Sequence, residues 1–149
     1  ERLCNMKHYT ICPKYTINAS VQPVEDEDLD IQQDIAITTD DVRSLRRLAN
    51  SKSWSVRAAV ADNPNTPAAL LDKLSKDISA VAGCVASNPN TPADTLTQLS
   101  KNPYVSVRRA VASNHNTPAD TLRNLRQDFD EVVRYSAYTT LLNIGMLEG

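Results

Sequence analysis

The sequence predicts an all-α fold: a solenoid of short helix pairs that repeats every 25 to 26 residues. Two landmarks support this prediction. The phrase Asn-Pro-Asn-Thr-Pro occurs at 63–67 and 88–92, and again at 114–118 with His115 replacing the first proline. The same spacing is kept by Val56, Val81, Val107 and Val133, and by Leu48, Leu74, Leu99 and Leu125. A period of this length is typical of stacked units that bury their apolar faces against one another.

The second helix of each unit is expected to begin at the phrase. Its threonine is a suitable N-cap, because a hydroxyl can accept a hydrogen bond from an unpaired backbone N–H. The proline that follows suits the first helical position, where no N–H is needed. Leu70, Leu71 and Leu74 then form one apolar stripe. The predicted caps are Thr66, Thr91 and Thr117, with Asp40 in the equivalent place of the first unit.

The first helix of each unit is expected over 56–61, with counterparts at 81–86 and 107–112. Val56, Ala59 and Val60 are spaced i, i+3 and i+4, so they share one helix face. The helix should stop at Asn63, because the residue before a proline is biased out of the helical region. Asparagine tolerates left-handed dihedrals and suits a helix C-cap. Asn63, Asn88 and Asn114 are therefore expected to satisfy backbone groups rather than to contact a ligand.

The chain divides into an irregular, acidic N-terminal segment, 1–35, and a helical repeat domain, 36–149. Residues 1–39 carry three basic and seven acidic side chains, a balance of 3 − 7 = −4, whereas the remainder has 13 − 11 = +2. Such an acidic run is typical of a solvated linker. No Asn-Pro follows Val133, so we expect a longer terminal helix that caps the end of the solenoid.

The composition argues against several classes of protein. Two histidines, three glycines and the lack of a Gly-rich phosphate loop or a Ser/His/Asp order indicate a protein that is not an enzyme. No apolar run approaches the roughly 18 residues of a membrane span, and the first 20 residues contain no signal-peptide core. Three cysteines, an odd number, favour free thiols in a reducing compartment. A cytoplasmic location without a membrane partner is expected.

The repeat resembles the leucine-rich repeat variant family. The resemblance rests on the run from Val107 to Asn114 (Val-Arg-Arg-Ala-Val-Ala-Ser-Asn) followed by Leu122 and Leu125, with equivalents that begin at Val56 and Val81. It covers roughly residues 40–140. The resemblance implies alternating α- and 3₁₀-helices in a right-handed superhelix. It also implies a scaffold similar to HEAT and armadillo solenoids, which mostly bind other macromolecules, and it brings no shared catalytic residue.

Cys4, His8 and Cys12 are spaced i, i+4 and i+8, which places them on one side of a helix or a strand. These are zinc-ligand residue types, but a structural zinc site normally takes four ligands and no fourth lies nearby. A relative in the resembled family carries an iron–sulfur cluster on a cysteine-rich N-terminal segment. A cluster normally requires four cysteines, and this segment has two. We therefore expect no cofactor, and either free thiols or one disulfide.

Arginines and aromatic residues make up the candidate binding surface. Stacking would align Arg57, Arg108 and Arg134, either to bind an anion or to pair with Asp and helix-end carbonyls of neighbouring units. We favour pairing, because Ala82 interrupts the row. Trp54 precedes one such helix, and aromatic residues beside arginine are common interface anchors. The full candidate set is Trp54, Arg57, Tyr104, Arg108, Arg109, Arg123, Arg126 and Arg134.

These observations favour a non-enzymatic scaffold that binds another protein. Two alternatives stay open. One is a nucleic-acid-binding repeat protein with an arginine-lined surface, because the repeat domain alone is slightly basic. The other is a metal-linked module in which Cys4, His8 and Cys12 bind zinc or an iron–sulfur cluster on the repeat scaffold.

Overall fold

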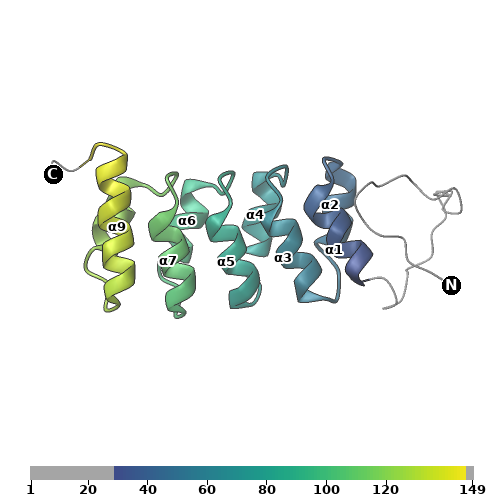
Figure 1. The fold of residues 1–149 in the computed structure, drawn as a ribbon, viewed down its shortest axis with the longest axis horizontal. Coiled ribbons are helices and arrows are strands. Elements are labelled where there is room, and N and C mark those ends of the chain that lie inside the picture. The colour runs from purple at the N-terminus through teal and green to yellow at the C-terminus, as the bar shows by residue number, and fades with distance from the viewer. Residues whose placement is uncertain (1–28, 147–149) are drawn as a thin grey trace, which may run out of the picture.

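The computed structural model describes residues 29–146. Within this range the chain forms nine α-helices and no strand, and Figure 1 shows the helices stacked side by side along one long axis. The all-α solenoid predicted from the repeat is therefore confirmed. The helices are α1 (Leu29–Thr38), α2 (Val42–Leu48), α3 (Trp54–Asp62), α4 (Ala68–Leu74), α5 (Ser79–Ser87), α6 (Ala93–Leu99), α7 (Val105–Ser113), α8 (Ala119–Leu125) and α9 (Glu131–Asn143).

The helices form two layers around one core. Each odd-numbered helix packs on the next odd-numbered helix, and each even-numbered helix packs against the helices before and after it in the chain. The odd-numbered helices contribute mainly valine and alanine to the core, and the even-numbered helices contribute leucine. A fully buried leucine or valine side chain stabilises the fold by about 1.5–3 kcal/mol. The largest fully buried side chains include Leu45, Leu71, Leu96, Leu122, Val56, Val81, Val107 and Val133.

The threonine of the repeated phrase does not cap the second helix. Pro67 occupies the N-cap position of α4 without a side-chain cap bond, and the Oγ1 of Thr66 donates to the carbonyl of Val60 at 2.5 Å. The predicted role was wrong, because the hydroxyl donates back to this carbonyl near the end of α3, which also accepts from the backbone N–H of Asn63. Thr91 and Thr117 make the same bond, to Val85 and Val111. In the first unit the cap of α2 is Asp41 rather than Asp40.

The phrase asparagines join successive units, as their expected backbone-satisfying role requires. Asn88 is 2% exposed, and its Nδ2 donates to the carbonyls of Ala61 and Asn63 at 2.7 and 2.9 Å. Its Oδ1 accepts from the backbone N–H of Asn90 at 2.8 Å. The backbone of Asn88 is extended, with φ −70°, and not left-handed as anticipated. Asn63 and Asn114 make equivalent bonds to the units before them.

The two ends of the array differ from the repeat. Helix α1 begins at Leu29 and buries Ala36 in the core, so residues 29–35 are helical rather than part of an irregular segment. Helix α9 runs for 13 residues and is capped by Asp130, whose carboxylate accepts from two backbone N–H groups of the first turn. The even-numbered helices are short α-helices of seven residues, where the resemblance suggested 3₁₀. No described helix is long and apolar enough to cross a membrane.

Candidate functional site

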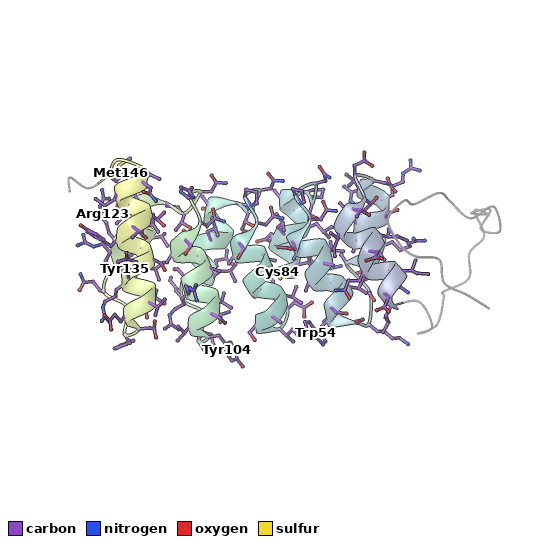
Figure 2. All side chains as sticks on the ribbon, in the orientation of Figure 1. Trp54, Cys84, Tyr104, Arg123, Tyr135 and Met146 are labelled. Atoms are coloured by element: carbon purple, nitrogen blue, oxygen red, sulfur yellow. The ribbon has the colours of Figure 1, made fainter. Side chains whose placement is uncertain are left out.

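One edge of the solenoid carries a row of exposed apolar side chains. The turns that lead from an even-numbered helix to the next odd-numbered helix lie there, and Figure 2 shows Trp54 and Tyr104 projecting from it. Trp54 is 53% exposed and Tyr104 57% exposed, although both precede buried valines of the core. Ile78 is half-exposed and Phe129 is fully exposed in the equivalent turns. We call these four residues, Trp54, Ile78, Tyr104 and Phe129, the apolar edge.

Lysines accompany the first three residues of the apolar edge. Lys52, Lys76 and Lys101 are exposed and lie in the same turns, two or three positions before Trp54, Ile78 and Tyr104. Lys76 approaches Asp72 at 3.5 Å, and both side chains are largely solvated. Exposed pairs of this kind contribute little to stability, because water and salt screen them. The lysine charges of this edge therefore remain available to a partner.

Arg57 and Arg108 stabilise the turns behind the apolar edge. The Nε of Arg57 donates to Asp77 at 2.5 Å and Nη2 donates to the second carboxylate oxygen at 3.0 Å. Its Nη1 donates to the carbonyls of Ser51 and Lys52 at 2.8 and 3.0 Å. Arg108 repeats this arrangement with Asp128, at 2.7 and 2.9 Å. The pairing predicted for these arginines is thus present, in a bidentate geometry that fixes both partners.

The hydrogen bonds from arginine set the protonation of the two carboxylates. The Arg57 side chain holds the pKa of Asp77 below its ordinary value, and burial opposes this shift less strongly. Arg108 lowers the pKa of Asp128 in the same way, with a smaller contribution from the charge of Arg134. Both carboxylates are therefore ionised and engaged at neutral pH.

The break in the arginine row has a structural cause. The connections that precede α3, α7 and α9 span five residues each, at 49–53, 100–104 and 126–130, whereas the connection before α5 spans four, at 75–78. Arginine binds two turn carbonyls only in the longer connections. The shorter one is followed by buried Ala82, and the repeat there is 25 rather than 26 residues long. The absence of an arginine at this position thus matches a tighter turn.

The remaining candidate arginines lie apart from one another. Arg134 donates to the carbonyls of Asp128 and Phe129. Arg123 pairs with Asp120 at 2.6 Å on the exposed side of α8, and the guanidinium of Arg126 stacks 5.5 Å from the ring centre of Tyr138. Arg109 lines a shallow surface pocket of about 290 Å³ with Ser87, Ser106, Ala110 and Ser113. The six candidate arginines therefore lie in different local surroundings and not in one basic surface.

Two members of the apolar edge were missed by the sequence prediction. The candidate set contains Trp54 and Tyr104 but neither Ile78 nor Phe129. A usable signal existed: all four edge residues lie two to four positions before a repeat valine, at 56, 81, 107 and 133. An apolar residue at that position precedes the helix that enters the core, so it stays outside the buried face.

The predicted metal ligands Cys4, His8 and Cys12 lie outside the described residues. Within residues 29–146 no group of three His, Cys, Asp or Glu side chains is placed to hold a metal ion. The described thiol is Cys84 of α5, which is free and half-buried. Burial raises the pKa of this thiol, and the negative charge of Asp62 raises it further.

Two layers of short helices, joined by asparagine side chains, define a helical repeat scaffold. Residues 54–77 match the family model of the leucine rich repeat variant. A solved structure described as a leucine-rich repeat variant with a novel repetitive structural motif matches 83% of this chain, at 28% sequence identity and a TM-score of 0.63. The chain spans about half of that protein, 52% of its length.

These findings confirm the resemblance: the chain carries the leucine-rich repeat variant motif and has its fold. The family is a structural scaffold rather than a known enzyme family. The comparison with curated proteins found no match.

Proposed function

We propose that this protein is a non-enzymatic scaffold that binds another protein along the apolar edge. The observation that supports this most directly is the exposure of Trp54, Ile78, Tyr104 and Phe129 in four successive turns. Large aromatic side chains are typical anchors of protein interfaces. In three of these turns an arginine side chain donates to two backbone carbonyls, which limits the entropy lost when a partner binds.

The size of the apolar edge suits an interface. An aromatic side chain buries about 150–250 Å² when it is fully covered. Four side chains that are half-exposed or more would supply on the order of 400 Å². A standard interface buries about 800 Å² on each partner, so the apolar edge would form the centre and the adjoining lysines part of the rim.

The alternative of a nucleic-acid-binding surface lined by arginines has less support from the structure. Arg57, Arg108 and Arg123 are paired with aspartates, and Arg126 is stacked on Tyr138. Arginines that already neutralise carboxylates have less charge to offer to phosphates, which dominate affinity for nucleic acid. The metal-linked alternative concerns residues outside the described range and stays open.

Affinity capture with three baits tests the proposal. The first bait is the wild-type chain, and the second carries Trp54→Ser, Tyr104→Ser and Phe129→Ser. The third is a matched control with Tyr135→Ser, which changes an aromatic side chain exposed to 67% away from the apolar edge. A protein partner retained by wild type and control but lost with the edge variant is expected. A partner retained equally by all three baits would place the interface elsewhere and refute the proposal.

A further inference from the structure

The apolar edge has an uneven charge along its length. From Trp54 to Tyr104 it carries Lys52, Lys76 and Lys101, while Asp77 within this stretch is neutralised by Arg57. Around Phe129 the charges are mixed, because Asp130 and Glu131 follow it directly and Arg134 donates a hydrogen bond to its carbonyl. A partner that lies on the first three turns therefore meets cationic side chains next to each apolar anchor.

The geometry of the stack also fixes the spacing of the anchors. Trp54, Ile78 and Tyr104 stand at the beginnings of α3, α5 and α7, and these helices are direct neighbours. Packed helices lie about 8–10 Å apart. An extended chain rises about 3.1–3.4 Å per residue, so three residues of such a chain span one step. An α-helix places same-face residues about 5–6 Å apart on successive turns and reaches about 10.5 Å only at every seventh residue, so an extended segment contacts all three anchors with the shorter stretch of chain.

We infer that the partner presents an extended acidic segment, with an apolar side chain at every third residue, to the stretch from Trp54 to Tyr104. The inference rests on the proposed function and specifies its ligand. Each apolar side chain would contact one anchor, and the intervening carboxylates would face Lys52, Lys76 and Lys101. In a polyproline II conformation, with three residues per turn, every third side chain points to the same side, which is the arrangement that these anchors require.

Synthetic peptides test this inference against the full chain. The probe has nine residues, with leucine at positions 2, 5 and 8 and glutamate or aspartate elsewhere. One control peptide has the same composition with its leucines moved together, and a second has lysine in place of every acidic residue. Fluorescence anisotropy measures the binding of each peptide to four proteins. These are the wild type, a double variant with Trp54→Ser and Tyr104→Ser, a double variant with Lys52→Glu and Lys101→Glu, and the Tyr135→Ser control.

The probe is expected to bind the wild type and the Tyr135→Ser control with the same affinity. Each double variant should weaken it by at least about tenfold, the size of a hot-spot loss. A higher salt concentration should also weaken binding of the probe, because the ion pairs between its carboxylates and the lysines are exposed to solvent. Equal binding of the clustered-leucine peptide would refute the three-residue spacing, and equal binding of the lysine peptide would refute the acidic chemistry.

Two further outcomes would overturn the inference. One is that no peptide binds while the captured partner still depends on Trp54 and Tyr104. The protein-binding function would then stand, and only the chemistry assigned to the partner would be wrong. The other is that a twelve-nucleotide single strand binds in place of the probe and is lost in both double variants. Aromatic stacking beside lysines would then serve nucleic acid.

Discussion

Replacing Asn88 by alanine should weaken the whole stack. The Asn88 amide makes two hydrogen bonds to carbonyls of the preceding unit and accepts one from the backbone of Asn90. All three involve a side chain that is 2% exposed, so water does not readily replace the lost partner. At about 1 kcal/mol for each net hydrogen bond, Asn88→Ala should lower the free energy of unfolding by about 3 kcal/mol.

A matched control lies in the same repeated phrase. Asn65 is exposed, and its backbone N–H donates to Oδ1 of Asn63 at 2.7 Å. Asn65→Ala leaves that backbone bond in place, so the change should stay within about 0.5 kcal/mol. Urea denaturation followed by far-UV circular dichroism measures both variants. A loss below 1 kcal/mol for Asn88→Ala would contradict the argument that these amides join the units.

Three further predictions follow from the clamps, the thiol and the apolar edge. Asp77 and Asp128 have folded pKa values below those of the unfolded chain. Their stabilisation is therefore present above the unfolded value of about 3.9 and is lost as the pH falls through the folded values. Asp77→Asn with Asp128→Asn should destabilise the protein at pH 7 and much less at pH 2–3 in urea denaturation, and an equal loss at both pH values would argue against the clamps. Cys84 should react with iodoacetamide more slowly than a fully exposed thiol at neutral pH, because burial and the charge of Asp62 raise its pKa above its ordinary value; peptide mass spectrometry resolves this site, and fast labelling at pH 7 would be inconsistent with its burial. Trp54→Ser and Tyr104→Ser should each change the unfolding free energy by less than about 0.5 kcal/mol, because both side chains are exposed at the surface; a larger loss would mean that they support the fold.

The periodic part of the fold could be predicted from the sequence because its signals are local and repeated. The repeat valines and leucines define which helix faces are buried, and all of them are buried in the structure. The N-terminal boundary could not be found in this way, because α1 lacks the phrase and begins within an acidic run. Its helix is recognised by Ala36, which packs into the core, and by the Asn63 bonds that reach its carbonyls.

The chemistry of the phrase threonine was harder to predict, for a physical reason. A threonine before a helix can either accept from the helix that follows or donate to the helix that precedes it. The choice depends on which backbone group lacks a partner in three dimensions. In all three copies the hydroxyl donates to a carbonyl near the end of the preceding helix, and this includes the third copy, in which His115 replaces the proline. The sequence spacing alone is compatible with both hydrogen-bonding roles of the threonine.

The candidate site was predicted in part. The equivalence of Arg57 and Arg108 was readable from the period, but their acceptors Asp77 and Asp128 stand 20 positions away. Ile78 is not aromatic, so only its position three residues before Val81 marks it as a member of the apolar edge. The contacts of Arg109, Arg123 and Arg126 could not be predicted, because the repeat pattern determines which side chains are buried but not which partners the exposed side chains contact.

The asparagine bonds have an evolutionary consequence. The amide of Asn88 binds the backbone of Asn63, and the amide of Asn114 binds the backbone of Asn88 in the same way. These junctions therefore use the same asparagine bonds, and a duplicated or deleted stretch of 25 or 26 residues would rejoin through the same amide contacts. Such an event would also add or remove one exposed anchor. Gene duplication could in this way lengthen the recognised segment by three residues at a time while the core chemistry stays unchanged.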